Sequence, residues 1–469
     1  MKTDIGIIGM AVMGQNLALN VESNGYSVSV YNRSETRTRE LVEKAGENRE
    51  IVPTYELAEF VNSLKKPRKI LLMIKAGDPV DKVISDLTPL LDEGDVILDG
   101  GNSNFEDTDR RVREVNSQGL LYLGTGISGG EYGARHGPSI MPGGNEEAYE
   151  IVGEILEDAA ARTNEGPCCA YLGPRSAGHY VKMVHNGIEY GIMEAISEAY
   201  WLMNKGLDLS PKKMGSIFER WNEDLDSYLM EITVPILKRE DEETGKPLIN
   251  FILDTAGQKG TGKWTAQNAL DLGVPVPTIS AAVDGRFISS RKEERLANSK
   301  KLGLKESGGL SEIDAPLEAI HSGLRLAIIN AYTQGIYLLK VASEEYDYGL
   351  DLEEVARIWK DGCIIRSNLL GKIQQGLRTN PKNPNLLFEE PFLSTIEQLV
   401  GPTMKILSAG RKAGVPLPAM SASLDYLSGF SSPDLPANMI QAQRDYFGAH
   451  TYQRRDREGT FHTEWGKGS

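Results

Sequence analysis

The longest helical pattern in the sequence runs from about Ala177 to Lys205. Apolar side chains recur there at the three- and four-residue spacing of an α-helix: Val181, Val184, Ile188, Ile192, Ala195, Ala199 and Leu202. A polar arc lies beside this stripe on a helical wheel, not opposite it: Lys182, His185, Asn186 and Glu189. Lys182 and Glu189, seven residues apart, point the same way about 10 Å apart along the axis. The pattern predicts a helix that presents a lysine and a carboxylate to one ligand; a solvated helix face is the alternative.

At the N-terminus, a short apolar strand from Asp4 to Ile8 is followed directly by an apolar-periodic helix through Leu17 and Val21. The turn between them matches the dinucleotide fingerprint, with alanine at the second glycine position: Gly9-Met10-Ala11-Val12-Met13-Gly14. A small residue at Ala11 lets the backbone approach a pyrophosphate, and the helix N-terminus favours the anion. The sequence therefore predicts an α/β N-terminal Rossmann-like dinucleotide-binding domain.

The second predicted strand, Ser27 to Tyr31, ends in Asn32-Arg33-Ser34. NAD-binding proteins usually place an acidic residue at this point to hold the ribose hydroxyls, and this chain has none. Arg33 can pair with a 2′-phosphate and Ser34 can donate a hydrogen bond to it. We therefore expect NADP as the cofactor instead of NAD, although an exposed turn with one arginine would show the same pattern.

Three further predicted strands each precede a loop that could contribute to a site. The strands are Lys69–Ile74, Val96–Leu98 and Leu120–Leu123, and the loops are Lys75-Ala76-Gly77, Gly100-Gly101-Asn102 and Gly124 to Gly130. Ligands of open α/β sheets bind outside the carboxyl ends of the strands, so we expect these loops to converge. The loop residues predicted to contact the cofactor are Ile74, Lys75, Ala76 and Asn102. Ser128-Gly129-Gly130 could present N–H groups and a hydroxyl to a carboxylate, or could simply be a glycine-rich turn.

After about Ser176 the strand signals disappear, and helical segments dominate to about Ser432. Gly206-Leu207-Asp208-Leu209 recurs as Gly349-Leu350-Asp351-Leu352, each copy after a long helix and before a segment with a tryptophan. This faint repeat predicts a large all-α domain that contains a duplicated helical unit. The predicted domains are residues 1–176, residues 177–433 and a C-terminal tail of residues 434–469.

Between the two copies, the stretch from Ile252 to Trp264 contains three glycines. Such a glycine density inside a helical domain indicates a close approach of the backbone to another group. Lys259, Thr261 and the later Arg286 are suitable hydrogen-bond donors to a phosphate. A surface loop with ordinary lysines is the alternative.

Composition narrows the class of protein. A formal charge of −15 argues against nucleic acid or an anionic membrane as the main partner. The three cysteines, of which Cys168 and Cys169 are adjacent, form neither a disulfide framework nor a metal-ligand spacing, so no metal is expected. No apolar run approaches the roughly 20 residues of a membrane helix, and the first residues lead into a strand instead of a signal peptide. A cytoplasmic location is expected.

Over essentially its full length, the chain resembles the 6-phosphogluconate dehydrogenases, NADP-dependent oxidative decarboxylases of the pentose phosphate pathway. The motifs that carry the resemblance are Ile252 to Trp264, Lys182 to Tyr190, Ser128-Gly129-Gly130, Gly9-x-Ala11-x-x-Gly14 and Asn32-Arg33-Ser34. One departure is Met10-Ala11, where the family more often has Leu-Ala or Leu-Gly. A small residue still faces the pyrophosphate, so the departure changes little.

The resemblance implies a reaction without metal. Neutral Lys182 takes the proton of the substrate's C3 hydroxyl as hydride passes to NADP, and the resulting 3-keto acid loses CO2. Glu189, in its acid form, then protonates C1 of the enediol to give ribulose 5-phosphate. Residues expected to bind 6-phosphogluconate are Asn102, Ser128, Gly129, Gly130, His185, Asn186, Tyr190, Lys259, Thr261 and Arg286. The implied assembly is a homodimer whose C-terminal tail carries Arg444 and His450 to the substrate phosphate in the partner's site.

Two alternative hypotheses remain at this point. The chain could be a related β-hydroxyacid dehydrogenase or an NAD-preferring 6-phosphogluconate enzyme; its second helical unit, its phosphate-binding set and Arg33 count against these. It could instead be a non-catalytic nucleotide-binding sensor. Such a protein would be expected to have lost Lys182 or Glu189, and both are present.

Overall fold

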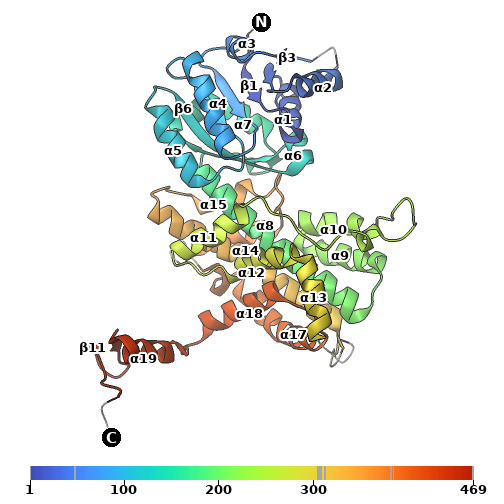
Figure 1. Ribbon diagram of the computed structural model, residues 1–469, viewed down its shortest axis with the longest axis vertical. Coiled ribbons are helices and arrows are strands. Elements are labelled where there is room, and N and C mark those ends of the chain that lie inside the picture. The colour runs from blue at the N-terminus through green and yellow to red at the C-terminus, as the bar shows by residue number, and fades with distance from the viewer. Residues whose placement is uncertain are drawn as a thin grey trace. The chain divides into compact units, whose positions relative to one another are not determined.

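The computed structural model describes residues 2–46, 49–303, 309–310, 313–380, 383 and 385–466. Residue contacts divide the chain into two units, Met1–Ser423 and Leu424–Ser469. The first unit begins with a sheet covered by helices and continues as a large helical region (Figure 1). Across the described part of the chain, every helix is too short or too polar to span a bilayer.

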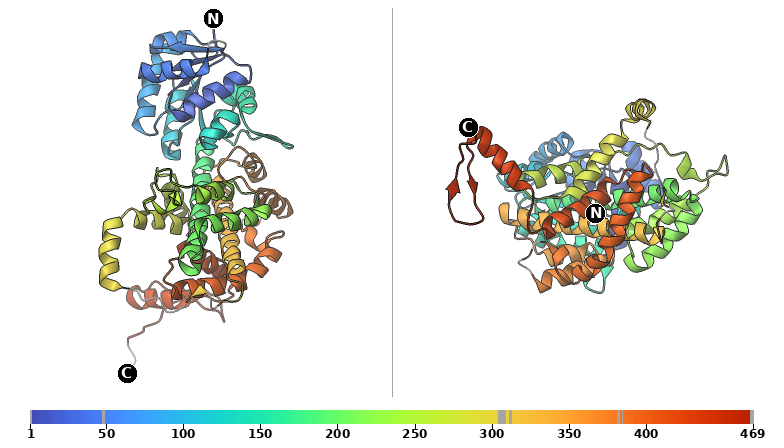
Figure 2. Two further views of the ribbon diagram at one scale, coloured as in Figure 1. Left: turned by 90° about the vertical axis from the view of Figure 1, so that its right-hand side faces the viewer. Right: turned by 90° about the horizontal axis from the view of Figure 1, so that it is seen from below.

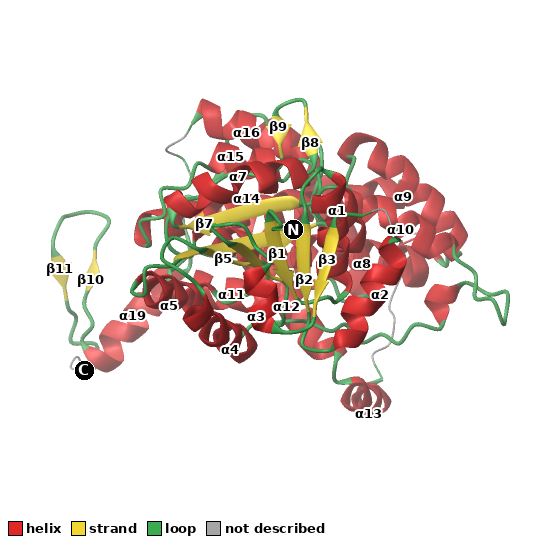
Figure 3. Ribbon diagram, turned by 90° about the horizontal axis from the view of Figure 1, so that it is seen from above, coloured by secondary structure: helices red, strands yellow, loops and turns green. Residues whose placement is uncertain are grey.

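The sheet of the first unit has seven strands in the order β3-β2-β1-β4-β5-β6-β7 (Figure 3). Their bounds are β1 Ile5–Ile8, β2 Val28–Tyr31, β3 Ile51–Thr54, β4 Lys69–Leu72, β5 Val96–Asp99, β6 Leu121–Ser128 and β7 Ser139–Gly144. All neighbours pair in parallel except β6 and β7, which are antiparallel. The strand order reverses between β1 and β4, and a dinucleotide binds at such a switch point. The predicted Rossmann-like fold is confirmed.

Helices cover both faces of this sheet. They are α1 Val12–Ser23, α2 Glu35–Ala45, α3 Leu57–Asn62, α4 Asp78–Leu87, α5 Phe105–Asn116, α6 Gly130–His136 and α7 Glu146–Ala159. Within β1, Ile5 and Ile7 belong to one buried cluster, whereas Ile8 belongs to a second cluster on the opposite face. Because both faces are buried, the parallel strands consist of nearly continuous apolar runs.

The sequence prediction was wrong about one of the loops. Gly124 to Ser128, expected as a loop, continues strand β6, and its turn is confined to Gly129 and Gly130 at φ +130° and +61°. The segment is held as a strand by antiparallel pairing to β7, from Leu123 opposite Gly144 to Ser128 opposite Ser139. Both β7 and β3 were absent from the predicted strands.

The predicted long helix is confirmed as α8, Ala177–Trp201, and it continues into a π-helical turn at Leu202–Gly206. Its first turn lies directly on the backbone of the sheet, because a Cβ at Gly178 would collide with the carbonyl oxygens of Gly124 and Met141. Farther along, α8 packs lengthwise against the 30-residue helix α14, Pro316–Glu345 (Figure 2).

Up to residue 431, nine further α-helices follow the sheet domain in the described part of the chain. They are α9 Pro211–Leu225, α10 Tyr228–Lys238, α11 Thr261–Asp271, α12 Pro277–Ser289, α13 Lys292–Leu302, α15 Leu352–Ile358, α16 Leu369–Thr379, α17 Leu393–Lys412 and α18 Pro418–Ser431. The two repeat copies occupy matching places, since Gly206–Leu209 follows α8 and Gly349–Leu352 follows α14. The predicted helical domain is therefore confirmed.

The second unit contains helix α19, Ala437–Gly448, and a small hairpin of β10, Tyr452–Gln453, and β11, Thr460–Phe461. Buried Asp445 organises it, accepting hydrogen bonds from Thr451 N, Thr463 N, His462 Nδ1 and Trp465 Nε1. The local order of this segment rests on this polar hub. Several large apolar side chains remain more than half exposed: Met439, Ile440, Tyr446 and Phe447.

Candidate active site

The turn between β1 and α1 has the geometry of a pyrophosphate-binding loop. Gly9 has φ +104°, and a Cβ at Gly14 would collide with Gly9 O, so helix and turn approach as closely as glycine permits. Met10 N donates to Asn32 Oδ1 at 3.0 Å, which fastens this turn to the end of β2. The first turn of α1 contains no carboxylate, so its N–H groups face an anion site free of negative charge.

Arg33 follows the end of β2 and its side chain is exposed. In the described part of the chain its guanidinium forms no ion pair, whereas the nearby Arg39 pairs with Glu35 at 2.9 Å. Asn32 is already engaged, since its amide nitrogen donates to Ser34 O at 2.9 Å while its oxygen accepts from Met10 N. Arg33 is thus a cation available to a 2′-phosphate, and Asn32 shapes the turn.

The loops after β1, β4 and β5 come together as predicted. A Cβ at Gly9 would lie 2.8 Å from Ile74 Cγ2, and one at Gly101 would lie 3.2 Å from Ile74 O. Lys75 and Asn102 are exposed at the neighbouring ends of β4 and β5. These residues therefore share the edge of the sheet at which a dinucleotide would lie.

Lys182 lies where α8 crosses strand β6. Its side chain contacts Gly126 so closely that a Cβ at this glycine would collide with it, and only 5% of the lysine is exposed. Burial lowers the pKa of Lys182 to about 8, although Glu189 and Cys363 oppose the shift. A lysine with this pKa is partly neutral near physiological pH and can accept a proton.

Glu189 lies two turns farther along the same face of α8, with its side chain 22% exposed. Burial raises its pKa, and the charges of Lys182 and Arg286 oppose the rise. Burial therefore shifts the pKa of Lys182 toward that of a usable base and the pKa of Glu189 toward that of a usable acid. Two groups whose pKa values are shifted toward opposite catalytic roles indicate an acid–base pair.

His185 is fully buried between these two residues, and burial with the nearby Lys182 charge holds its pKa well below the usual range. Nδ1 lies 3.0 Å from Asn186 Oδ1, an acceptor, so Nδ1 carries the proton. Nε2 then accepts from the Ser128 hydroxyl at 3.1 Å. This contact joins the end of β6 to α8 and orients the Ser128 side chain.

Helices α11 and α12 complete the site. Asn186 Nδ2 donates to Thr261 Oγ1 at 3.1 Å, so α8 contacts the start of α11. The Arg286 guanidinium of α12 stacks 3.7 Å from the ring centre of Tyr190. Lys259 is exposed in the loop two residues before Thr261. Residues predicted from distant parts of the sequence are therefore neighbours in the first unit.

One wall of the site was missed by the sequence analysis. The Trp359 ring packs edge-on against His185 at 5.6 Å, and Ile364 N donates to Ser128 Oγ at 3.4 Å. Between them, Gly362 O lies where a Cβ at Gly129 would collide. The available signals were Trp359 in the second repeat copy and the Asp-Gly turn at 361–362, but neither shows which strand the segment covers.

Arg444 and His450 lie in the second unit, on and just after α19, and both are exposed. Arg444 Nη1 donates to Gln441 Oε1 at 3.2 Å, which leaves most of the guanidinium open to another group. Their assignment to the substrate phosphate stays a prediction.

The first unit therefore combines a glycine turn suited to a dinucleotide, at the switch point of the sheet, with an acid and a base on helix α8. This combination defines a dehydrogenase that uses a nicotinamide dinucleotide. Two family models match the chain: the NAD binding domain of 6-phosphogluconate dehydrogenase over residues 4–173, and the 6-phosphogluconate dehydrogenase C-terminal domain over residues 178–465. The chain belongs to the 6-phosphogluconate dehydrogenase family.

Relatives match along their full lengths. The NADP(+)-dependent, decarboxylating 6-phosphogluconate dehydrogenase of Bacillus subtilis is 51% identical over 99% of this chain and 100% of its own. The decarboxylating enzyme of Synechococcus elongatus is 49% identical over 98% of both chains. The Plasmodium falciparum 6-phosphogluconate dehydrogenase structure, studied with NADP+ and with 6-phosphogluconate, superposes with a TM-score of 0.93 at 45% identity, covering 98% of this chain and 100% of its own.

Proposed function

We infer that the chain oxidises and decarboxylates 6-phospho-D-gluconate to D-ribulose 5-phosphate and CO2, with reduction of NADP to NADPH. The observation that carries this inference is the pair of oppositely shifted groups on one face of α8, Lys182 with a pKa of about 8 and Glu189 with a raised pKa. The full-length relatives from Bacillus subtilis and Synechococcus elongatus, both named as decarboxylating 6-phosphogluconate dehydrogenases, support the same reaction. A cytoplasmic enzyme is part of the proposal.

Lys182 begins the chemistry by accepting the proton of the C3 hydroxyl through its neutral amine. NADP, when bound, supplies the hydride acceptor for C3. Protonated Lys182 then donates a hydrogen bond to the new C3 carbonyl oxygen, which takes up negative charge as the C1 carboxylate leaves as CO2. Glu189 finally gives its proton to the carbon that lost the carboxylate, which yields ribulose 5-phosphate.

The residues present fit NADP. The glycine turn Gly9–Gly14 and the open N-terminus of α1 would hold the pyrophosphate, and exposed Arg33 would pair with the 2′-phosphate. Ile74 and Asn102, on the other side of β1 from Arg33, would contact the nicotinamide half.

The assay that tests the reaction follows reduced nicotinamide, CO2 and ribulose 5-phosphate after mixing the protein with 6-phosphogluconate and NADP. NAD in place of NADP tests for an NAD-preferring enzyme, and non-phosphorylated β-hydroxy acids test for a related dehydrogenase. A protein that binds NADP but turns over none of these acids would support the sensor hypothesis instead.

We expect Arg33→Ala to weaken NADP binding roughly ten- to a hundredfold, because it removes a charge-assisted contact of about 1.5–3 kcal/mol. NAD has no 2′-phosphate, so its dissociation constant should change little. Titration of both cofactors against the wild type and the variant measures the difference. The matched control is Arg39→Ala on α2, whose guanidinium is already paired with Glu35. Equal losses for NADP and NAD would mean that Arg33 only shapes the loop.

The proposal extends to the division of labour along the chain. Residues 1–176 bind NADP, residues 177–433 bind the substrate and form the dimer, and the tail of residues 434–469 enters the partner's site. Exposed Arg444 and His450, together with the uncovered apolar side chains Ile440 and Phe447, support a tail that packs against another subunit. The substrate phosphate is dianionic near neutral pH, and an acidic protein must gather cations to bind it.

Subunit mixing tests the crossed tail. Arg444→Ala and Lys182→Met homodimers are each expected to have low activity. If the tail crosses over, a mixed dimer has one site with both defects and one site with neither, so activity returns on subunit exchange. If the tail stays with its own subunit, every site keeps one defect and exchange restores nothing. Two Lys182→Met preparations mixed in the same way provide the control.

A further inference from the structure

Asp99, the last residue of β5, is the hub of a buried polar network outside the acid–base pair. Its side chain is fully buried. Oδ1 accepts from Gly101 N at 3.0 Å, and Oδ2 accepts from the Ser103 hydroxyl at 2.6 Å and from Tyr122 OH at 3.1 Å. The two loop contacts flank Asn102, so one carboxylate fixes the backbone on both sides of this predicted ligand-binding residue.

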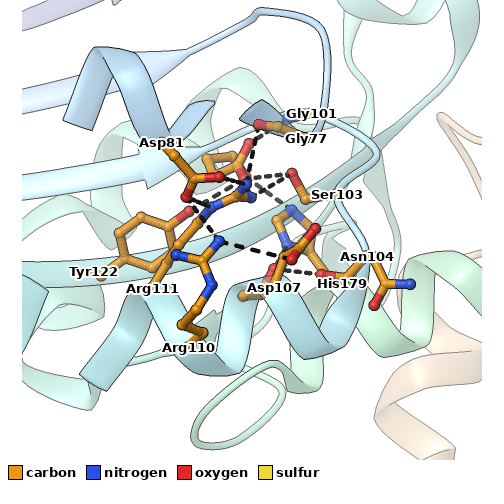
Figure 4. Close-up of polar contacts among 12 residues, drawn as sticks. Gly77, Asp81, Gly101, Ser103, Asn104, Asp107, Arg110, Arg111, Tyr122 and His179 are labelled. Carbon is orange, nitrogen blue, oxygen red and sulfur yellow. Dashed lines mark hydrogen bonds and ion pairs between the residues drawn. The ribbon is translucent and has the colours of Figure 1, made fainter. Parts of the chain in front are cut away.

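Arg111 of α5 connects this hub to the loop after β4. Only 1% of the residue is exposed. Its Nε and Nη2 donate to the two Asp81 oxygens at 2.8 and 2.9 Å, and Nη2 also donates to Gly77 O at 3.1 Å. Nη1 donates to Ser103 Oγ at 3.3 Å and lies 3.5 Å from Asp99 Oδ2. Figure 4 shows the guanidinium between the two loops, and no other cation drawn there contacts both.

The fork geometry of the Arg111 guanidinium allows it to donate to both carboxylate oxygens of Asp81 at once. A bidentate pair needs the planar, five-donor head of arginine, which a lysine ammonium does not reproduce. Hydrogen bonds from Arg111 and Arg110 lower the pKa of Asp81 to about 2, so the pair remains charged over the physiological range. Asp99 is fully buried, and a buried carboxylate without its cation is strongly destabilised.

The same strand end also contacts the catalytic helix. His179 Nε2 donates to the main-chain oxygen of Asp99 at 3.0 Å, and its Nδ1 lies 2.7 Å from Thr108 Oγ1 on α5. His179 is one turn before Lys182 on α8. The network therefore spans from the loops after β4 and β5 to the turn of helix that carries the base.

We propose that Arg111 is a positioning residue, which holds the loops containing Lys75, Ala76 and Asn102 in place for the nicotinamide half of the cofactor. The strand order supports the assignment of these loops to the nicotinamide half, because β4 and β5 lie on the opposite side of β1 from β2 and Arg33. The inference rests on the proposed function for the identity of the cofactor. Because the 2′-phosphate lies on the β2 side, loosening these loops weakens NADP and NAD binding by the same factor.

Arg111→Lys tests the proposal, since it keeps the charge and removes the fork. We expect the dissociation constants of NADP and NAD both to rise about tenfold, with their ratio unchanged, and the KM for 6-phosphogluconate to rise through Asn102. The matched control is Arg110→Ala. Arg110 precedes Arg111 on α5 and pairs with the side chains of Asp81, Asp107 and Glu114, but within the described chain it forms no hydrogen bond with either loop backbone. The dissociation constants of NADP and NAD for Arg110→Ala should stay within about twofold of those of the wild type.

Cofactor titration without substrate separates this inference from the proposed reaction. A wild type that binds NADP but does not oxidise 6-phosphogluconate would refute the reaction and leave the network testable. A folded Arg111→Lys protein with wild-type constants, or with weakened NADP binding alone, would overturn the positioning role. Should Arg111→Lys fail to fold, Ser103→Ala decides, because it removes only the hydroxyl between Arg111 and Asp99. We expect about a threefold rise for both cofactors, and unchanged constants would overturn the proposal.

Discussion

Replacing Lys182 by methionine is expected to lower the turnover of 6-phosphogluconate by about 10⁴-fold or more, at or beyond the upper limit for a single general base. The loss is this large because the same side chain accepts the C3 proton and then supports the carbonyl oxygen during decarboxylation. NADP should still bind, since its fingerprint lies on β1 and α1 and not on α8. Steady-state turnover and cofactor titration on the same protein measure both effects.

Lys182→Arg is the sharper control for this prediction. Arginine retains the positive charge, but it stays protonated at any pH that the protein tolerates and does not serve as the base. We therefore expect Lys182→Arg to be nearly as inactive as Lys182→Met. Activity within about tenfold of the wild type in either variant would remove Lys182 from the role of base.

Glu189→Gln is expected to slow proton transfer to C1 by about 10²–10⁴-fold, the usual contribution of a general acid. Exchange of hydrogen isotope at C1 of ribulose 5-phosphate isolates this step from oxidation.

The Glu189→Gln variant should also alter the pH profile of kcat/KM. The wild-type rate rises with pH as Lys182 loses its proton near a pKa of about 8. The Glu189 charge raises this pKa, so its removal moves the rise to lower pH.

Glu194→Gln provides the matched control on the same helix. Glu194 is another half-buried acid of α8 with a raised pKa, but its charged neighbour is Arg286 and not Lys182. Its substitution should leave C1 exchange and the Lys182 limb of the pH profile close to wild type. Exchange at the unmodified rate in Glu189→Gln would instead assign the acid to another group, and buried His185 would be the first to test.

Features that depend on local spacing were correctly predicted from the sequence. The 3.6-residue period defined α8 and placed Lys182 and Glu189 on one face, and the fingerprint Gly9–Gly14 identified the first strand, turn and helix. In both cases, the residues that define the feature lie close together in the sequence. Backbone geometry then determines their relative directions without help from the rest of the fold.

Strand pairing could not be predicted in the same way. Gly124 to Ser128 contains two glycines in five residues, a composition more typical of a turn than of a strand. The structure makes it a strand because β7 pairs with it and because Gly126 admits the Lys182 side chain at close range. A residue's partner across a sheet is set by register and topology, which local propensity does not encode.

The sequence by itself therefore determined the class of domain, the dinucleotide turn, the position of Arg33 after the second strand, and the placing of Lys182 and Glu189 on one face of α8, since each depends on residues close in the chain. Only the tertiary structure decided what surrounds them. The wall from Trp359 to Ile364 and the Asp99–Arg111 network join segments far apart in sequence. Burial at that junction moves the pKa of Lys182 to about 8, because desolvation depends on every segment that excludes water from the amine.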